Sequence, residues 1–425
     1  MIETIASPSQ VAVLCGGLGT RLLPLTAARP KPMVDVAGRP FLEHLLQQFA
    51  NCGLTRFVLM TGYLGDQIRD HFGSGADRGW QVEYSDGPAE WETTRRLVEA
   101  LPLLDERFVL LYSDNFAPVD LDALLEAHRS NRTALTATLK VKKPGNIGIG
   151  LDGSVAIYDA NRIVGGLDHV EIGYMVVERD RVRGLWAGID GQPDVNFSQV
   201  LQRAASAGEF GGYVAGGPYF SVSDPTRLET TRRALGDRRV LLIDRDGTIN
   251  RPVGCGRYVA RWEDFEFRED TVEAMEVLAA EGFSFIVITN QAGIALGVVD
   301  PLEVDRIHRQ MVTELARRGI PILNVYVCAD HWDSGSARRK PAPGMFYEAA
   351  QDHALLLDRV LYVGDDLRDC QAAAAAGCGM VFLADEATRH DLPKSRYHQS
   401  VHASLLGAID LIRAHHPHGQ EGLRP

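Results

Sequence analysis

The sequence has few cysteines and no long apolar run. Six cysteines stand among 425 residues, and no two of them form a Cys-x-x-Cys pair. This scarcity excludes a disulfide scaffold and favours a reducing compartment. The longest apolar stretch, residues 372–384, contains glycines and is too short to cross a bilayer. Because the first ten residues also lack a basic segment and an apolar core, we expect no signal peptide and a cytoplasmic location.

An excess of basic residues is also missing. The formal net charge is −12, from 44 basic and 56 acidic residues. Because a nucleic-acid backbone needs a basic protein face, we expect neither a nucleic-acid nor a membrane partner. A small phosphorylated substrate needs only a locally positive pocket and stays compatible with this charge. The oligomeric state is left open, a homo-oligomer included.

The sequence does contain two similar openings, each an apolar strand that runs into a polar or glycine-rich loop. Residues 11–15 precede Gly16-Gly-Leu-Gly19, and residues 239–243 precede Asp244-Arg-Asp-Gly-Thr248. Open α/β sheets present their chemistry in this way, at the carboxyl ends of strands. Strand and helix patterns alternate through both halves, which predicts two Rossmann-like α/β domains, each a mainly parallel sheet flanked by helices.

A chain of 425 residues is too long for one ordinary core. We place the seam near residues 235–238, between a helix pattern and the second opening strand. The predicted domains are residues 1–236 and 237–414, and the tail 415–425 is expected to be disordered. Further predicted strands cover 57–60, 108–112, 285–288, 325–328 and 360–363, and predicted helices cover 41–52, 271–281 and 300–318.

The first loop has the character of a phosphate-binding turn. Its glycines allow the backbone to approach an anionic chain closely, and Arg21 and Lys31 add two mobile positive charges. The Walker spacing GxxxxGK[ST] is absent, which excludes a P-loop ATPase. A glycine turn that only packs a strand against a helix is the weaker alternative, because both cations are present. The residues expected to touch a nucleotide are Gly16, Gly17, Gly19 and Thr20.

The run that begins at Gly16, Gly-Gly-x-Gly-Thr-Arg-Leu-x-Pro-x-Thr, is followed by Pro30-Lys-Pro-Met33. Together they resemble the opening motif of nucleotide-sugar pyrophosphorylases, the sugar-1-phosphate nucleotidyltransferases, over about residues 10–235. The resemblance implies attack by a sugar-1-phosphate oxygen on the α-phosphorus of a nucleoside triphosphate, with pyrophosphate leaving. It implies that Arg21 grips the pyrophosphate and that Lys31 neutralises the phosphates near the reacting phosphorus.

The same resemblance implies a Mg²⁺ ion held by Asp114 and Asp194, for which a turn or cap aspartate is the alternative. The sequence departs from the family at residues 91–97, Trp-Glu-Thr-Thr-Arg-Arg-Leu, where Arg95 would replace a small residue. The family's Glu-Lys-Pro segment is also missing before Glu171, which could bind sugar hydroxyls. Lys142, Lys143 or Arg162 could then hold the sugar phosphate.

The second half contains the groups that phosphate-monoester hydrolysis needs. They are a carboxylate nucleophile, an acid two residues on, a hydroxyl and a lysine for the phosphoryl group, and acids for Mg²⁺. The segments are Asp244-Arg-Asp-Gly-Thr248, Thr289-Asn-Gln291, Arg339-Lys-Pro-Ala-Pro-Gly344 and Gly364-Asp-Asp366 with Asp369. A domain without activity is the alternative, and the presence of every expected charge argues against it.

This ordered set resembles the haloacid dehalogenase superfamily over about residues 238–410. The resemblance implies that Asp244 is the nucleophile and Asp246 the acid and base. It implies that Thr289 and Lys340 hold phosphate beside Asn290, and that Asp365 binds Mg²⁺ with Asp244 and Asp246. Asp366 is expected either to bind the metal or to support the residues that do.

The closer resemblance is to the heptose 1,7-bisphosphate and histidinol phosphatase branch, in which Arg339 would contact the remote phosphate or the hydroxyls. That branch often binds structural zinc. Here Cys328 and His331 supply two of the four ligands that a closed site needs, so we predict no zinc.

The two resemblances make joint chemical sense, because a phosphatase acting on a sugar bisphosphate leaves a sugar 1-phosphate for the other domain. They imply a bifunctional enzyme that dephosphorylates heptose 1,7-bisphosphate and transfers a nucleotidyl group, from GTP, to heptose 1-phosphate. One alternative is a mannose- or glucose-1-phosphate nucleotidyltransferase fused to another sugar-phosphate phosphatase. Another is a phosphatase regulated by a non-catalytic nucleotide-sugar-binding domain.

Overall fold

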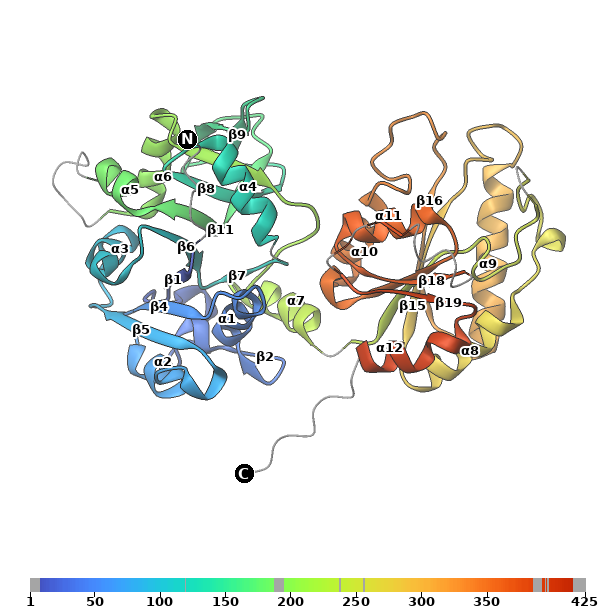
Figure 1. Cartoon of the computed structure of the whole chain (residues 1–425), viewed down its shortest axis with the longest axis horizontal. Coiled ribbons are helices and arrows are strands. Elements are labelled where there is room, and N and C mark those ends of the chain that lie inside the picture. The colour runs from blue at the N-terminus through green and yellow to red at the C-terminus, as the bar shows by residue number, and fades with distance from the viewer. Residues whose placement is uncertain are drawn as a thin grey trace. The chain divides into compact units, whose positions relative to one another are not determined.

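The computed structural model describes residues 8–118, 120–186, 195–236, 238–254, 257–384, 392–393, 395 and 397–415. The chain divides into two compact units, one ending at Leu235 and the other starting at Gly236. Each unit has its own sheet and its own buried core (Figure 1).

The first unit contains thirteen of the labelled strands and seven of the labelled helices in the described ranges. The strands are β1 (Gln10–Leu14), β2 (Asp35–Val36), β3 (Arg39–Pro40), β4 (Arg56–Thr61), β5 (Gln81–Asp86), β6 (Arg107–Tyr112), β7 (Asn115–Phe116), β8 (Leu135–Val141), β9 (Ile147–Ile149), β10 (Val155–Tyr158), β11 (His169–Glu178), β12 (Phe210–Val214) and β13 (Phe220–Ser221). The helices are α1 (Phe41–Asn51), α2 (Gly65–Phe72), α3 (Thr93–Ala100), α4 (Leu121–Asn131), α5 (Arg179–Trp186), α6 (Phe197–Ser206) and α7 (Pro225–Leu235).

A nine-stranded mixed sheet forms the centre of this unit. β5, β4, β1 and β6 are parallel neighbours, so their carboxyl ends share one edge of the sheet. β11 runs antiparallel to both β6 and β8 and continues the sheet on that side. α3, α5 and α6 bury their apolar residues against one face. β1 is buried along its whole length, as expected of an inner parallel strand.

The second unit has a six-stranded parallel sheet in the order β16-β15-β14-β17-β18-β19. The strands are β14 (Val240–Ile243), β15 (Ser284–Asn290), β16 (Ile322–Cys328), β17 (Leu361–Gly364), β18 (Gly379–Leu383) and β19 (Gln399–His402). The helices are α8 (Glu269–Ala280), α9 (Pro301–Arg317), α10 (Gly344–His353), α11 (Leu367–Ala376) and α12 (Ile409–His415).

Side chains of β14 alternate between two separate cores. Leu241 and Ile243 face α8, α9 and α12, whereas Val240 and Leu242 face α10 and α11. A strand covered on both faces therefore reads as one continuous apolar run, which is how it could be recognised in the sequence.

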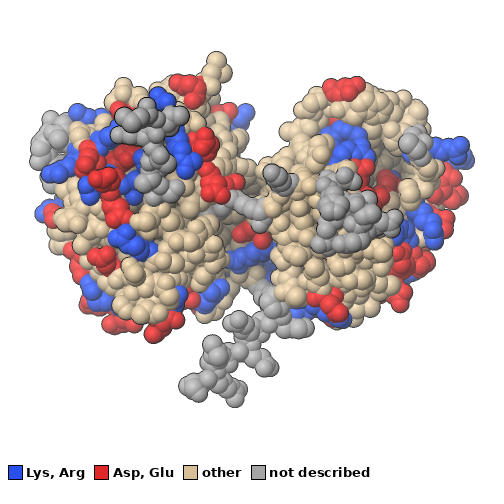
Figure 2. Space-filling view, in the orientation of Figure 1, with Lys and Arg blue, Asp and Glu red and all other residues tan. Residues whose placement is uncertain are grey.

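The α/β prediction is confirmed in both units, and the predicted strands and helices are present with ends displaced by up to three residues. The first sheet is mixed rather than mainly parallel, because β11 reverses direction. No helix in the described ranges has the length and apolar character needed to cross a membrane. Figure 2 shows acidic and basic side chains interspersed on the face in view, without a large surface of one sign.

Candidate functional site

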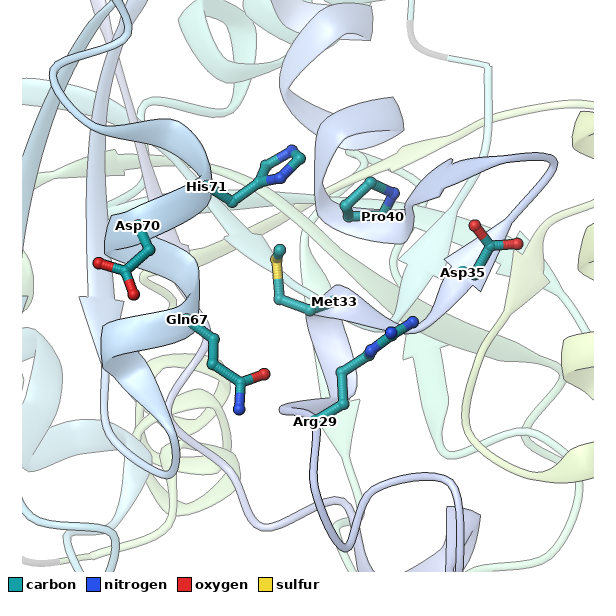
Figure 3. Close-up of a pocket in the computed structure, with 7 residues that line it drawn as sticks. All are labelled: Arg29, Met33, Asp35, Pro40, Gln67, Asp70 and His71. Carbon is teal, nitrogen blue, oxygen red and sulfur yellow. The ribbon is translucent and has the colours of Figure 1, made fainter.

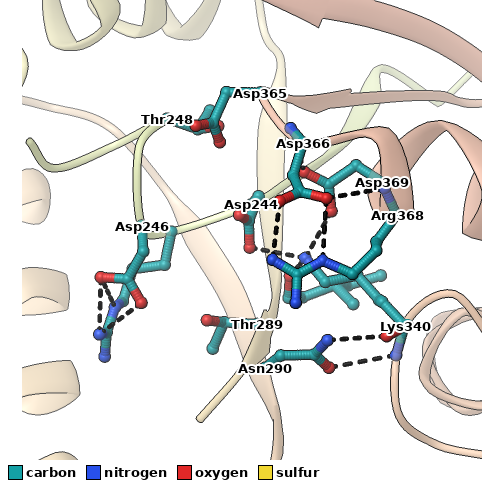
Figure 4. A network of polar contacts seen from close by, with 12 residues as sticks. Asp244, Asp246, Thr248, Thr289, Asn290, Lys340, Asp365, Asp366, Arg368 and Asp369 are labelled. Carbon is teal, nitrogen blue, oxygen red and sulfur yellow. Dashed lines mark hydrogen bonds and ion pairs between the residues drawn. The ribbon is translucent and has the colours of Figure 1, made fainter. Parts of the chain in front are cut away.

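The catalytic candidates of the second unit meet at the carboxyl edge of its sheet. Asp244 directly follows β14, and Thr289 and Asn290 end β15. Asp365 follows Gly364, the last residue of β17. Because these strands are parallel neighbours, their ends bring the side chains together (Figure 4).

Lys340 is the centre of a buried polar network. Its Nζ donates to Oδ1 of Asp244 at 2.7 Å and to the hydroxyl of Tyr362 at 2.8 Å. The same Nζ lies 2.7 Å from Oδ1 of Asp369, and only 4% of the Lys340 surface is exposed. Burial alone would lower the pKa of Lys340, but the carboxylates of Asp244 and Asp369 raise it above its usual value. Lys340 therefore stays charged in the interior.

Asp244, Asp365 and Asp369 form the candidate metal site of this unit. Each can place one carboxylate oxygen within 4.8 Å of the other two. Burial raises the pKa of Asp365 to about 6, with a further contribution from the charge of Asp369. Burial likewise raises the pKa of Asp244, against the opposing charge of Lys340. A single lysine cannot balance three carboxylates, so the cluster favours a cation, and hard oxygen donors suit Mg²⁺.

Hydrogen bonds already occupy the carboxylate of Asp369. Its Oδ1 accepts from the Tyr362 hydroxyl at 3.1 Å and lies beside Lys340. Its Oδ2 accepts from the backbone N–H of Asp366 at 3.2 Å. Asp369 is 1% exposed, and both of its carboxylate oxygens already have partners. This carboxylate therefore holds the neighbouring groups in place and is not available as a metal ligand.

Among the described residues, each of the other two carboxylates has one oxygen without a hydrogen-bond donor. Asp365 accepts one bond, to Oδ1, from the hydroxyl of Thr248 at 3.0 Å. Within the described part of the chain, Oδ2 of Asp244 accepts none. A Cβ at position 247 would overlap the carboxylate of Asp365, and the glycine there leaves that space to the carboxylate. Asp244 and Asp365 are therefore the residues that would hold a divalent cation.

Asp246 lies apart from this cluster (Figure 4). Arg245 pairs with its carboxylate at 2.7 Å, Gln291 donates to it at 2.7 Å and Asn250 donates at 3.1 Å. Burial acts to raise the pKa of Asp246, but these donors lower it, so the group is a carboxylate in this conformation. The sequence predicted that Asp246 binds the metal with Asp244 and Asp365. In the structure its side chain does not join the metal cluster.

A hydrogen bond to a histidine holds Arg245 in place. Its Nη1 lies 2.8 Å from Nε2 of His308, and the arginine side chain is fully buried. Because an arginine only donates, Nε2 is the acceptor and His308 is neutral. Burial, followed by the charge of Arg245, lowers the pKa of His308 to about 3.

The remaining phosphate-binding candidates take different positions. Thr289 Oγ1 accepts from Gln291 at 2.8 Å, beside the Asp246 carboxylate. Asn290 exchanges two hydrogen bonds with the backbone of Lys340, at 3.0 and 3.1 Å, and so fixes the loop that carries the lysine (Figure 4). Arg339 donates to a backbone carbonyl, that of Asp330, at 3.0 Å.

Asp366 belongs to the start of α11. It is the N-cap, and it forms a capping box with Asp369, the third residue of the helix. Its carboxylate also pairs with Arg368 at 2.7 Å. These contacts place Asp366 in the support of the metal loop.

Cys328 is the buried last residue of β16, and burial raises the pKa of its thiol. The sulfur lies 3.5 Å from a carboxylate oxygen of Asp330. His331 lies near Asp333, with 3.7 Å between Nδ1 and Oδ2. The prediction that no zinc is bound here stays a prediction.

In the first unit, the structure brings Lys31 and Asp114 together. Lys31 starts a short turn after the glycine loop, and Asp114 follows β6. Their Nζ and Oδ2 atoms are 2.7 Å apart. Thr20 and Arg21 are exposed on the same loop, where they can reach a ligand in solution. A lysine beside a carboxylate at the carboxyl edge of the sheet suits a site for a phosphate and its cation.

Arg96, rather than Arg95, stands against the glycine loop. Arg96 is 4% exposed, and its guanidinium donates to the carbonyls of Thr61 at 2.7 Å and Pro88 at 2.6 Å. A Cβ at Gly16 would collide with that guanidinium. The expectation for Arg95 was therefore wrong by one residue, because α3 starts at Thr93 and turns Arg96 inward. Arg95 instead stacks on Trp91, 4.6 Å from the ring centre.

Glu171 lies at the irregular part of β11. The pairing of β11 with β8 shifts between Glu171 and Met175, and Gly173 there has φ = +74°. Oε2 of Glu171 accepts from the Gly173 N–H at 2.7 Å. Burial raises the pKa of Glu171 to about 7. A carboxyl group near neutrality can both donate to and accept from hydroxyl groups, which suits a sugar.

A hollow of about 470 Å³ lies behind the loop that carries Lys31 (Figure 3). Gln67 of α2 lines this hollow. Its side chain donates to the carbonyl of Ala28 at 3.0 Å and so anchors that loop. The lining residues are Arg29, Met33, Asp35, Pro40, Gln67, Asp70 and His71. Asp194, the second metal ligand expected in this unit, lies outside the described residues.

Comparison with known proteins finds a family for each unit. Residues 10–148 match the Nucleotidyl transferase family model, and residues 337–407 match the HAD-hydrolase-like model. The D-glycero-alpha-D-manno-heptose-1,7-bisphosphate 7-phosphatase of Burkholderia mallei is 40% identical over 152 residues, which cover 34% of this chain and 79% of that protein. The chain belongs to the HAD-like phosphatases. Its first unit carries a nucleotidyltransferase domain, so the protein combines two enzymes.

Two other relatives qualify the comparison. The HAD-like phosphatase unit is also 35% identical over 150 residues to the D-glycero-beta-D-manno-heptose-1,7-bisphosphate 7-phosphatase of Photorhabdus laumondii, covering 34% of this chain and 78% of that protein. A mannose-1-phosphate guanylyltransferase of Mycobacterium tuberculosis is 36% identical over 161 residues, covering 37% of this chain and 44% of that protein. Similarity alone therefore leaves the sugar anomer open.

The HAD-like phosphatase unit contains functional residues that the motifs did not reveal. Tyr362 joins the network only because β17 lies beside β14, and Gln291, which stands in a quoted motif, had no role assigned to it from the sequence. Arg96 in the nucleotidyltransferase unit had no signal of its own, because the sequence pointed to Arg95 as the residue in place of a small one. Asp369 stood in a quoted motif, but the sequence did not reveal its contact with Lys340.

Proposed function

We propose that the second unit removes the 7-phosphate of D-glycero-D-manno-heptose 1,7-bisphosphate and that the first unit transfers a nucleotidyl group to the resulting heptose 1-phosphate. The observation that carries the proposal is the contact of Asp244 with Lys340, 2.7 Å apart and beside Asp365 at the carboxyl edge of the sheet. A carboxylate there can attack phosphorus while the lysine neutralises the charge that is transferred.

In the proposed hydrolysis, a carboxylate oxygen of Asp244 bonds to phosphorus as the bond from phosphorus to the sugar oxygen breaks. Asp246, after it has left Arg245 and taken up a proton from solvent, gives that proton to the departing oxygen. It later takes a proton from the water that splits the phospho-aspartate, which frees inorganic phosphate. For either step Asp246 has to leave Arg245, which now holds its carboxylate. A bound Mg²⁺, held by Asp244 and Asp365, would supply positive charge to the phosphoryl oxygens.

In the proposed transfer, the loop from Gly16 to Thr20 holds the triphosphate through its backbone N–H groups. Lys31 neutralises the phosphates near the reacting phosphorus, and the exposed Arg21 grips the departing pyrophosphate. Asp114 would hold a Mg²⁺ ion there, and its present pairing with Lys31 keeps both groups ready for the charged substrate.

Pathway logic supports GTP and the α-anomer. A nucleotidyltransferase of the pyrophosphorylase type fits the α-anomer, and the product of the first reaction is the acceptor of the second. One relative is named for guanylyl transfer, whereas the relatives of the phosphatase unit carry the names of both anomers. A second candidate acceptor is mannose 1-phosphate, which the name of the related mannose-1-phosphate guanylyltransferase favours.

A substrate panel tests the proposal. The full chain is given sugar 1,7- and 1,6-bisphosphates of both anomers, and phosphate release is measured. In parallel, heptose, mannose and glucose 1-phosphates are offered with each nucleoside triphosphate, and pyrophosphate release is measured. We expect the highest kcat/KM with α-heptose substrates and GTP. Preference for mannose 1-phosphate would select the second candidate, and failure of all heptose substrates would refute the proposal.

Asp244→Asn and Arg21→Ala then assign the two activities. The amide cannot form a phospho-enzyme, so the first variant should lose phosphate release and keep pyrophosphate release. The second should do the opposite, with a loss of about 10²–10³ in transfer. Phosphate release that survives Asp244→Asn would contradict the nucleophile assignment.

A further inference from the structure

The hollow behind the Lys31 loop lies between two segments of the first unit (Figure 3). On one side is α2, which contributes Gln67, Asp70 and His71 at the spacing of a single helix face. On the other side is the segment of residues 29–40, which carries Lys31. The hollow of about 470 Å³ has the volume of a small-molecule site. None of its lining residues is among those assigned to the triphosphate, the sugar or the metal.

Three charged side chains in this lining have no partner in the described part of the chain. Arg29, Asp35 and Asp70 are exposed, and no described residue forms an ion pair or a hydrogen bond with any of these side chains. His71, by contrast, is already paired, because its Nε2 lies 2.8 Å from a carboxylate oxygen of Glu43. The three exposed charges are therefore available to a ligand that carries the matching groups.

The positions of these charges favour a ligand with two different ends. Figure 3 shows Arg29 and Asp70 on opposite sides of Met33. A guanidinium binds a phosphate group through two parallel hydrogen bonds, whereas a carboxylate accepts hydrogen bonds from hydroxyl groups. Met33 and Pro40 add apolar surface on which the C–H face of a sugar ring can pack. Together these groups suit a phosphorylated sugar, either free or as the ribose phosphate of a nucleotide.

The hollow borders the segment that positions Lys31. Gln67 donates to the carbonyl of Ala28, three residues before Lys31, at 3.0 Å. Tyr63, just before α2, donates from its hydroxyl to the carbonyl of Ala27 at 3.0 Å. These two bonds already anchor the segment to α2. A ligand that contacts both sides of the hollow would add a further link between them.

The same segment is attached to the glycine loop. The hydroxyl of Thr26 donates to the carbonyl of Gly19 at 2.9 Å. A Cβ at Gly19 would lie 2.9 Å from Cβ of Lys31, so the lysine stem packs directly on this loop. A ligand that holds the segment from behind therefore holds Lys31 against the glycine loop. Two ligands that favour the same conformation strengthen each other's binding.

We propose that this hollow is a regulatory site for a phosphorylated sugar, and that its occupation strengthens the binding of a nucleoside triphosphate to the first unit. The phosphate binds Arg29, and the hydroxyl groups bind Asp70. The effect on catalysis rests on the proposed transfer function, whereas binding in the hollow does not.

Calorimetry on the full chain tests the binding. The Asp244→Asn chain is used because it should not hydrolyse the probes, and EDTA removes the metal that the two candidate catalytic sites need. Ribose 5-phosphate represents a free sugar phosphate and GMP a nucleotide, whereas ribose and inorganic phosphate each carry one end alone. At least one of the two complete probes should bind about tenfold more tightly than ribose or phosphate, and the tighter one identifies the source.

Two variants locate the bound probe. Arg29→Gln and Asp70→Ala should each weaken its binding about tenfold. Arg129→Gln and Glu126→Ala remove exposed charges of the same kinds from α4 and should leave binding unchanged. Failure of both complete probes to bind, or equal binding by the wild-type, Arg29→Gln and Asp70→Ala side chains in this background, would overturn the site.

Steady-state kinetics test the regulation, again in the Asp244→Asn chain and with Mg²⁺ present. The probe that binds should lower KM for GTP about fivefold and leave kcat nearly unchanged. Arg29→Gln and Asp70→Ala should keep the basal rate and lose this response. Competition between the probe and GTP, or the same response in both variants, would overturn the regulatory role. A chain that binds the probe and transfers nothing refutes the proposed transfer function alone, and Kd for GTP with and without the probe then measures the coupling.

Discussion

Nζ of Lys340 lies 2.7 Å from Oδ1 of Asp369, a residue of which 1% is exposed. The same ammonium group lies 2.7 Å from Asp244. One buried charge therefore serves a candidate nucleophile and a supporting acid at once. Removing one partner of a buried ion pair leaves the other charge uncompensated, so each of these residues depends on the other two.

Asp369→Asn should reduce phosphate release about hundredfold, because Lys340 loses one of the two charges that hold it in place. The matched control is Asp366→Asn, which keeps an efficient N-cap on α11 and should retain most of the activity. Steady-state kinetics of the two variants, with circular dichroism to confirm folding, make the comparison. Equal losses in both would mean that helix capping, rather than the position of Lys340, explains the effect.

Gly16→Ala should impair nucleotidyl transfer, whereas Gly17→Ala should be tolerated in the fold. An added Cβ at Gly16 meets the guanidinium of Arg96, which is buried and held by carbonyls, while nothing lies within 4 Å of the corresponding position at Gly17. Overpacking of this kind costs about 1–3 kcal/mol in stability. Thermal unfolding of both variants and their Kd for GTP measure the difference. A Gly16→Ala protein as stable as the Gly17→Ala protein would contradict the tight contact.

Chelation should stop both activities, and added Mg²⁺ should restore both. The candidate ligands, Asp114 in one unit and Asp244 with Asp365 in the other, offer hard carboxylate oxygens. Activity assays after EDTA treatment and Mg²⁺ addition test this. Elemental analysis should find no stoichiometric zinc, and one tightly held zinc ion per chain would overturn our interpretation of Cys328 and His331.

Lys140 should contribute increasing stability to the first unit as the pH rises from 8 to 10.5, whereas the buried Cys15, whose pKa burial raises to about 12, acts in the opposite direction. Burial lowers the pKa of Lys140 from 10.5 to about 8, and its Nζ donates to the carbonyls of Gly216 and Gly217. Below pH 8 the Lys140 side chain is charged in both the folded and the unfolded state, and the folded state bears the full free-energy cost of burying that charge. Above pH 8 the folded state loses its proton first, so the Lys140 contribution to the free energy of unfolding rises by up to about 3 kcal/mol.

Urea unfolding at pH 8 and pH 10 measures this effect. Lys140→Met should remove the rise with pH, and Lys143→Met, which deletes an exposed charge nearby, should keep it. The same pH dependence in both variants would show that another group is responsible.

The sequence was informative wherever one local pattern determined both structure and chemistry. Buried parallel strands are continuous apolar runs, and the residues that follow them, such as Asp244 and Asp365, lie at one edge of the sheet. Lys340 could be placed in the site because its motif is distinctive. These features need no knowledge of how distant segments pack.

The remainder depends on tertiary contacts that no local pattern encodes. Whether Asp246 faces a metal or Arg245 depends on three donors from separate segments. The reversal of β11 follows from its pairing with β6 and β8, which its apolar sequence does not specify. The misplaced emphasis on Arg95 arose because the inward face of a helix shifts with its first residue.

The bare backbone at Gly247 offers a way to separate the two enzymes genetically. Its φ of +85° already favours glycine, and its Cα faces the carboxylate of Asp365 so closely that one methyl group would displace it. A Gly247→Ala allele would keep every acidic residue and the whole first unit while silencing phosphate release. Under the proposed function, a cell carrying it would accumulate the sugar bisphosphate while its transferase stays intact, and so would reveal which of the two reactions limits formation of the nucleotide sugar.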